Sequence, residues 1–396
     1  MHYRNKNNPD NLSILGFGCM RFPKKGNGFD HEEIERELKY AVDNGVNYFD
    51  TAYIYPGNEE ELGRALKNTG YRDRIKLASK MPHYLMKSVE EAEKKFGEQL
   101  LRLRTDHIDY YLMHMLPDAK TWEALRARGI DKWLEEKKEK GQIRRIGYSF
   151  HGSSEMFIRI LNAYDWDFAQ IQHNYLDWNH ASGRNVNSSY LYGELAARDI
   201  PMTVMEPLRG GALANVPESV SAKMLARAPG KSIASWAFRY AGSQPKILSV
   251  LSGMTYMEHL QDNIATYSDF TPCTEEELEF LERIAIEMTE FPLIECTACN
   301  YCLPCKYGID IPGIFMHYNK CIREDLMPMS SGDKNYRKLR RAFLVGMDRS
   351  VNPLHQASHC IGCADCIPKC PQTINIPLLL QQIDRFTENL KQNKEF

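Results

Sequence analysis

The chain of 396 residues lacks several features that would assign it to a common functional class. No apolar run approaches the ~18–20 residues needed to span a bilayer. Residues 1–10 are polar, without the apolar stretch of a signal peptide. Lys and Arg total 50 against 52 for Asp and Glu, so there is no electrostatic footprint for nucleic acid or for an anionic membrane surface. We therefore expect a cytoplasmic protein with neither of these partners.

Cysteine is unevenly distributed along the chain. Of the 11 cysteines, all but Cys19 and Cys273 lie after residue 290. Disulfide bonds are a poor explanation in a large chain with no secretion signal, whereas clustered thiols indicate metal or redox chemistry. The length suits one large domain and one small one. We expect the first domain over residues 1–290 and a thiol-rich second domain over residues 291–396.

Up to about residue 266, short β-branched or aromatic runs alternate with longer helical patterns. Strict alternation of strand and helix implies right-handed crossover units and a parallel sheet. Eight such units over roughly 250 residues are what a closed (β/α)8 TIM barrel requires. The predicted strands cover residues 13–19, 47–52, 74–80, 107–114, 144–150, 168–174, 201–206 and 247–253.

A doubly wound open sheet is the competing α/β architecture. It normally has a glycine-rich nucleotide loop after its first strand. The first predicted strand contains Gly16 and Gly18 but no third glycine in register, which favours the barrel. One further helix is predicted over residues 274–290, where Thr274 and Glu277 form a capping-box pattern.

Two runs of thiols stand out in the second domain, an earlier one from Cys296 to Cys305 and a later one from Cys360 to Cys370. The later run matches the bacterial ferredoxin spacing, including Pro371 after its last cysteine. In two-cluster ferredoxins that last cysteine binds the other cluster. The spacing therefore predicts a ferredoxin-like domain with two 4Fe-4S clusters and exchanged fourth ligands. The first thiol set is Cys296, Cys299, Cys302 and Cys370, and the second thiol set is Cys305, Cys360, Cys363 and Cys366.

The earlier run departs from this pattern, because only two residues separate Cys302 from Cys305 and Lys306 replaces the usual proline. Zinc also accepts four thiolates, but its sites usually consist of two Cys-x-x-Cys pairs rather than two triplets with remote fourth thiols. Residues 309–312 and 374–377 follow the two runs as near copies, and we expect them to cover the clusters. The remaining thiols, Cys19, Cys273 and Cys321, are interpreted as small buried side chains.

The chemistry of a barrel gathers at the carboxyl ends of its strands. Asp50, Lys80 and His114 end three successive predicted strands, and Tyr55 follows Asp50 closely. An ammonium beside a tyrosine favours the phenolate and lowers the phenol pKa. Lys80, held by Asp50, thus makes Tyr55 a usable proton donor, and His114 can orient the oxygen that receives the proton. Each residue alone is more simply read as structural, and the combination favours catalysis.

These residues resemble the active-site tetrad of the aldo-keto reductase family. The matching segments include residues 49–55, 60–66, 146–150, 170–174 and 207–211, and with the tail nearly the whole chain is similar to the ferredoxin-fused branch of that family. The resemblance implies a (β/α)8 barrel and reversible carbonyl reduction with NADP or NAD. It assigns catalysis to Asp50, Tyr55, Lys80 and His114.

The same resemblance implies a set of cofactor contacts. Ser149 and Gln172 would contact the carboxamide, and Asn263 the adenine. Met205 stands where many members place an aromatic ring, and the loop after residue 252 offers only His259 as a donor to a 2′-phosphate. Arg21 and Arg209 either face an anionic substrate or the cofactor's pyrophosphate, or lie on a solvated rim. The cofactor-binding residues predicted are Ser149, Gln172, Met205, Pro207, Leu208, Gly253 and Asn263.

Hydride transfer between a small carbonyl or alcohol substrate and the cofactor needs no iron. The thiol-rich tail, residues 291–396, must therefore have a separate function. It either passes single electrons from a ferredoxin-like carrier, in an enzyme fed by its clusters rather than by free NAD(P)H, or serves structure. A third alternative is a non-catalytic module that binds dinucleotide for redox sensing or docking. The basic stretch 334–341 either docks an acidic carrier or is a solvated helix face.

Overall fold

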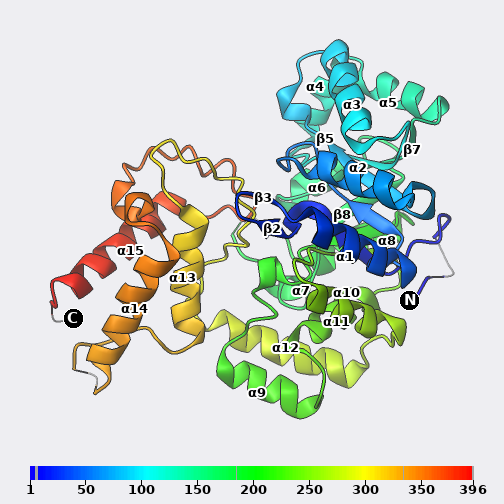
Figure 1. The fold of residues 1–396 in the computed structure, drawn as a ribbon. Coiled ribbons are helices and arrows are strands. Elements are labelled where there is room, and N and C mark those ends of the chain that lie inside the picture. The colour runs from blue at the N-terminus through cyan, green and yellow to red at the C-terminus, as the bar shows by residue number, and fades with distance from the viewer. Residues whose placement is uncertain (5–7, 184, 333, 395–396) are drawn as a thin grey trace. The chain divides into compact units, whose positions relative to one another are not determined.

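The computed structural model describes residues 1–4, 8–183, 185–332 and 334–394. The chain divides into two compact units. The first comprises Met1–Asn179, Val186–Pro207 and Ala234–Glu279, and the second comprises His180–Asn185, Leu208–Ile233 and Phe280–Phe396. Figure 1 follows the chain from one terminus to the other by colour.

The first unit holds a closed barrel of eight parallel strands, in the order β1-β10-β9-β8-β7-β6-β5-β4. The predicted (β/α)8 barrel is thereby confirmed, and each of its strands falls within a predicted run or one residue from it. A separate two-stranded sheet pairs β2 (Lys24–Lys25) with β3 (Gly28–Phe29). The barrel strands are β1 (Leu15–Gly18), β4 (Tyr48–Asp50), β5 (Lys76–Met81), β6 (Ile108–Met113), β7 (Ile143–Ser149), β8 (Phe168–Gln172), β9 (Met202–Met205) and β10 (Ile247–Ser252).

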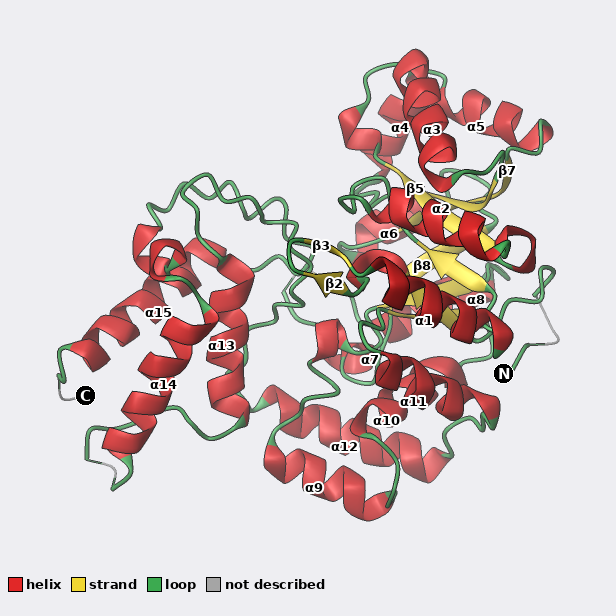
Figure 2. Ribbon diagram, in the orientation of Figure 1, coloured by secondary structure: helices red, strands yellow, loops and turns green. Residues whose placement is uncertain are grey.

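Helices connect the strands, as the alternation predicts (Figure 2). Helix α12 begins with the predicted capping box, because the Thr274 N–H donates to Glu277 and the Glu277 N–H donates to the Thr274 hydroxyl. The helices are α1 (His31–Asp43), α2 (Asn58–Thr69), α3 (Val89–Leu103), α4 (Ala119–Ala127), α5 (Ile130–Glu139), α6 (Ser154–Leu161), α7 (Asp177–His180), α8 (Ser188–Ala197), α9 (Glu218–Arg227), α10 (Ile233–Ser243), α11 (Met257–Ser268) and α12 (Glu275–Thr289). The 3-10 turns before residue 300 are η1 (Cys19–Arg21), η2 (Arg72–Arg74), η3 (His83–Leu85) and η4 (Arg209–Gly211).

Large side chains fill the barrel interior. The ring of Tyr110 meets Tyr48 at 5.3 Å and Phe168 at 5.0 Å between centroids, both edge to face. All three rings are fully buried. These rings fill the barrel toward the amino ends of its strands. The open rim lies at the carboxyl ends, where Asp50 and Lys80 stand.

The tail of the second unit is built from helices and loops in the part of the chain that the structure describes (Figure 2). Helices α13 and α15 start alike, because Asp310 and Asn375 accept the N–H of Gly313 and Leu378, each with a proline in the first turn. These are the near-copy segments noted in the sequence. The tail elements are α13 (Ile311–Arg323), α14 (Tyr336–Ser350), η5 (Pro353–His355), η6 (Ala357–His359) and α15 (Ile376–Lys391).

The predicted boundary at residue 290 stays a prediction. The second unit begins at Phe280 and also includes the segments His180–Asn185 and Leu208–Ile233, which the sequence reading assigned to the barrel domain. Among the described residues, no helix has the length and apolar character needed to cross a membrane.

Helix α1 carries a buried carboxyl group, Glu37, whose two oxygens have no hydrogen-bond partner among the described residues. Burial, with Glu33 adding to it, raises the pKa of Glu37 from 4.5 to about 8. The folded state therefore holds a proton that the unfolded chain has lost above pH 4.5. We predict that the free energy of unfolding falls as pH rises from about 4.5 to about 8, and that Glu37→Gln is the more stable protein at pH 8.

Urea unfolding at pH 5 and pH 8 measures this effect, for which each pKa unit corresponds to about 1.4 kcal/mol. Glu61→Gln is the matched control, because Glu61 is equally buried but its carboxylate is paired with Arg64. That variant should lose stability instead. Equal pH dependence in wild type and Glu37→Gln would contradict the assignment.

Candidate active site and thiol sets

Four predicted side chains meet at the carboxyl ends of β4, β5 and β6. The Lys80 Nζ donates to Asp50 Oδ1 at 2.5 Å and to the Thr51 carbonyl at 2.7 Å. It also lies 5.1 Å from the centroid of the Tyr55 ring. The Tyr55 and His114 rings face each other edge to face at 6.1 Å. The structure thus brings Asp50, Tyr55, Lys80 and His114 together.

Burial controls the charges of this group. Asp50, Lys80 and His114 are each less than 5% exposed. Burial, the Lys80 ammonium and two further histidines hold the pKa of His114 well below its usual range, so this imidazole is neutral. Burial also raises the pKa of Asp50, while Lys80 opposes that rise. A neutral imidazole beside an ammonium can donate a hydrogen bond without competing for the proton of the tyrosine.

A buried polar network, which the sequence reading did not identify, supports the strand that carries Lys80. Glu59 accepts hydrogen bonds from Ser79 Oγ (2.6 Å) and Gln99 Nε2 (2.7 Å). The same Gln99 amide reaches the Lys80 carbonyl at 3.3 Å, and its oxygen accepts from the Tyr111 hydroxyl at 2.7 Å. Helices α2 and α3 therefore hold the end of β5 in place. The family-like segment that follows Glu59 was the available signal.

Gln172 and Ser149, predicted to contact the nicotinamide carboxamide, lie at the ends of β8 and β7. The Gln172 amide nitrogen donates to Asp177 at 2.6 Å, and Asn174 donates to the same carboxylate oxygen at 2.6 Å. This bond fixes which end of the Gln172 amide is the acceptor. Ser149 Oγ accepts the N–H of Met115 at 2.8 Å. Asp177 has no motif of its own, so sequence reasoning missed it.

The other predicted cofactor residues lie on helix α11 and in or after β9 and β10. Asn263, on α11, donates to the Ser252 hydroxyl at 3.0 Å. Arg21 lies against Gly253, its Cδ 3.0 Å from where a Cβ on that glycine would stand. This close approach joins a cation to the loop where barrels commonly hold phosphate. Met205 ends β9, Pro207 follows it in the first unit, and Leu208 belongs to the second unit.

Of the two alternatives for Arg209, burial contradicts the solvated rim, and contact with an anionic substrate or the pyrophosphate stays a prediction. Arg209 is 5% exposed, which excludes a solvated rim, and it forms an ion pair with Glu295 of the tail. Its guanidinium is thus engaged within the second unit. The physical reason is that a buried guanidinium needs a carboxylate partner, and Glu295 supplies one from a distant part of the chain.

The three spare cysteines, Cys19, Cys273 and Cys321, are buried, as predicted. The pKa of Cys302 is raised to about 12 by burial and then by its neighbours Cys299, Cys296 and Cys370. The pKa of Cys366 is raised by burial and by Cys360, Cys363 and Cys305. For Cys302 and for Cys366, the three thiols that raise the pKa are therefore the other three members of its predicted set.

The two thiol runs also share a backbone conformation. Ala298 and Asn300 have positive φ angles in the first run, and Gly362 and Ala364 have them at the matching places of the second. Such left-handed residues turn successive N–H groups toward one concave side. The Ala298 N–H already points at the sulfur of Cys296, at 3.4 Å.

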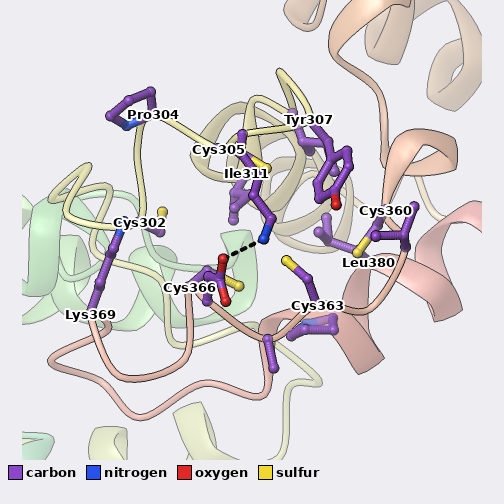
Figure 3. Close-up of a pocket in the computed structure, with 16 residues that line it drawn as sticks. Cys302, Pro304, Cys305, Tyr307, Ile311, Cys360, Cys363, Cys366, Lys369 and Leu380 are labelled. Atoms are coloured by element: carbon purple, nitrogen blue, oxygen red, sulfur yellow. Dashed lines mark ion pairs between the residues drawn. The ribbon is translucent and has the colours of Figure 1, made fainter.

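A pocket opens over the second thiol set. Figure 3 shows Cys305, Cys360, Cys363 and Cys366 around it, with the Lys306–Asp365 ion pair (2.7 Å) as the dashed line. Apolar side chains, including Ile309, Ile311 and Leu380, complete its lining. Four thiols in an apolar surround are the donor chemistry of an iron–sulfur cluster. Among the described residues, however, no group of three or more His, Cys, Asp or Glu side chains is placed to hold a metal ion directly.

Comparison with known proteins gives a match to the Aldo/keto reductase family over residues 14–286. Uncharacterized oxidoreductase YqkF of Bacillus subtilis is 26% identical over 294 residues, which cover 68% of this chain and 92% of that protein. The NADP(+) aldo-keto reductase yakc of Schizosaccharomyces pombe is 30% identical over 151 residues, 35% of this chain and 43% of that protein. Residues 287–396, with both thiol sets, lie beyond the family match.

Solved structures share the barrel. Aldo-keto reductase AKR11C1 from Bacillus halodurans, in its holo form, has a TM-score of 0.54 at 24% identity, with 69% of this chain and 92% of that chain covered. An aldo/keto reductase from Klebsiella pneumoniae, in complex with NADP and acetate, has a TM-score of 0.55 at 22% identity and the same coverage. At this identity the likeness concerns the fold.

The bond between Asp177 and Gln172 yields a prediction for cofactor binding. In Asp177→Ala the Gln172 amide loses the partner that orients it, so we expect KM for the nicotinamide cofactor to rise about tenfold, because a charge-assisted hydrogen bond is lost. The kcat at saturating cofactor should change little. Steady-state kinetics measure both.

Asp167→Ala is the control for this experiment. Asp167 also accepts a hydrogen bond at 2.8 Å, from the backbone N–H of Ile146, but stands just before β8, at the opposite end of the barrel. That variant should lose stability and keep the wild-type KM. A wild-type KM in Asp177→Ala would remove Asp177 from the cofactor site.

Proposed function

Because the chain belongs to the aldo/keto reductase family, we propose that it interconverts a carbonyl and an alcohol by hydride transfer with a nicotinamide cofactor. The observation that carries the proposal is the Lys80 ammonium, which lies 2.5 Å from Asp50 and 5.1 Å from the Tyr55 ring. An ammonium so placed stabilises the phenolate form of the tyrosine. Burial of Lys80 excludes water that would weaken this electrostatic interaction. The substrate class is a small carbonyl compound or alcohol.

The residues divide the work as follows. When bound, the nicotinamide supplies a hydride to the carbonyl carbon. Tyr55 gives its proton to the carbonyl oxygen, and the Lys80 ammonium stabilises the phenolate left behind. Asp50 holds that ammonium in place. Neutral His114 donates a hydrogen bond to the same oxygen and orients it.

The cofactor in this proposal is NADP(H), the one named for the relative in S. pombe and bound in the K. pneumoniae structure. Gln172 and Ser149 would hold the carboxamide, and Asn263 the adenine. Arg21 beside Gly253 offers a cation to the phosphates, and this is the feature of the rim that fits the group. Met205, Pro207 and Leu208 would line the nicotinamide side.

We further propose that the tail holds two 4Fe-4S clusters. The first thiol set would bind one and the second thiol set the other. In support, the other three thiols of each set act on the half-buried Cys302 or Cys366 and raise its pKa. Such clusters supply one-electron chemistry. Reduced thiols of this kind suit the cytoplasm, which is the location we propose.

A ferredoxin-like carrier is the protein partner proposed for the tail. Cys363 is exposed and Ile361 beside it is 66% exposed, so the second thiol set is open to a partner. The basic stretch 334–341 is less open than its sequence suggests. Arg340 donates to the carbonyls of Leu390 and Lys391 at the end of α15, and Tyr336 is buried.

The catalytic assignment predicts the behaviour of Tyr55→Phe. This variant keeps the ring and removes the proton donor, so turnover of a panel of aldehydes and ketones should fall at least 100-fold. NADPH affinity, measured by fluorescence titration with NADH alongside, should stay within about twofold. Near-normal turnover would end the assignment. A wild-type protein that binds the dinucleotide but turns over no carbonyl would favour the docking-module alternative.

The cluster proposal predicts about eight iron atoms per chain and a brown colour after anaerobic purification, since each 4Fe-4S cluster holds four. In Cys370→Ser the iron content should fall to about four, whereas Cys273→Ser should keep all of it. A reduced ferredoxin added without nicotinamide should bleach the colour. Zinc in place of iron would overturn the clusters, and product formed in this assay would favour the cluster-fed enzyme over hydride transfer.

A further inference from the structure

The loop that follows β9 is joined to the first thiol run inside the second unit. Arg209 forms its ion pair with Glu295, the residue before Cys296, and its guanidinium also donates to Ser182 Oγ at 3.4 Å. Arg209 has a φ of +47°, a conformation that L residues adopt only where the surroundings hold them. The ion pair with Glu295 is such a constraint.

The next residue of the loop is in closer contact still. Gly210 has a φ of +67°, and a Cβ on it would lie 2.2 Å from the Thr297 carbonyl oxygen. Only glycine permits this approach. Thr297 is 3% exposed and stands between Cys296 and Cys299. The backbone of the loop and the backbone of the thiol run therefore touch.

A second contact of the same kind involves the fourth thiol of this set. Asn185 Nδ2 donates to Gln372 Oε1 at 3.1 Å. A Cβ on Gly183 would lie 2.4 Å from Thr373 Oγ1. Gln372 and Thr373 follow Cys370 closely, and Gly183 and Asn185 follow α7, which begins with Asp177.

Both parts of the first thiol set thus hold a segment that continues from the predicted cofactor site. One segment starts at Leu208, directly after Pro207, and the other follows Asp177, the partner of Gln172. All four thiols of the second set line the pocket, together with Cys302 of the first set, and Cys363 is exposed there. A centre that draws the first four thiols together must also fix the two segments.

We infer that Glu295 and Thr297 are positioning residues for the cofactor loop, and that filling the first thiol set raises the affinity for the nicotinamide cofactor. This inference rests on the proposed function. Ordering of a loop by one ligand lowers the entropic cost of binding a second. The coupling is reciprocal, so bound dinucleotide should also slow the loss of metal from this set.

The test compares Glu295→Gln with wild type, both as iron-loaded protein. The substitution keeps the shape of the side chain and removes the charge that Arg209 needs. We expect the Kd for NADPH to rise about tenfold, within the usual range for coupled sites, while iron content and visible absorbance stay unchanged. Glu287→Gln is the matched control, because it breaks the Lys223–Glu287 pair of the same unit, away from the loop, and should change nothing.

Trypsin gives a readout that does not depend on turnover. Cleavage after Arg209 should be slow in the loaded wild type and fast in Glu295→Gln. Wild-type protein stripped of iron by a chelator should show both the fast cleavage and the weaker NADPH binding. Gly210→Ala is the second variant, since its methyl group would push the loop off Thr297, and it should behave like Glu295→Gln.

Wild-type NADPH affinity and slow cleavage in both variants would overturn the inference. So would equal NADPH affinity in stripped and loaded wild type. These outcomes differ from failure of the proposed function, which shows as absent iron, or as turnover that survives Tyr55→Phe. An enzyme that passes those two tests and fails this one has clusters and catalysis without the coupling.

Discussion

The buried ion pair between Lys80 and Asp50 is the interaction on which the rest of the site depends. Removing both charges from water costs several kcal/mol per ion, and only a close partner offsets that cost. The pair forms because β4 and β5 are neighbours, with Asp50 opposite Ala78 in register. Glu59, Ser79 and Gln99 then hold the end of β5. Removal of one partner leaves a lone buried charge, so neither residue can vary alone.

The barrel and the gathering of Asp50, Tyr55, Lys80 and His114 were predictable from the sequence, because the strands repeat and these residues follow strand ends. Each strand is a short apolar run, and Asp50, Lys80 and His114 each end one. Asp177 and Gln99 were not predictable, because their roles depend on where a side chain turns after the chain has folded. Arg209 shows the same limit. Its partner, Glu295, is 86 positions away, and no spacing rule connects them.

The thiol sets depend partly on local spacing in the sequence and partly on packing in the folded chain. The ferredoxin spacing predicts which cysteine of each run crosses to the other set, and Cys370 is among the thiols that raise the pKa of Cys302. The exchange itself stays a prediction. Gly183, Asn185 and the segment Leu208–Gly211 lie within residues 1–290 of the sequence, next to barrel elements. In the structure they contact residues of the tail, within the second compact unit. Local patterns identify such segments, but the partner of a loop is decided by packing.

The duplicated form of the tail has a consequence for synthesis. Each run carries the same left-handed turns and leads into a helix capped by Asp310 or Asn375. With the proposed exchange of the fourth thiol, neither copy can complete its own set. A chain interrupted just before Cys370 would hold all four thiols of the second set but only three of the first. With that exchange, metal uptake by the first set would wait until Cys370, near the end of the chain, has left the ribosome.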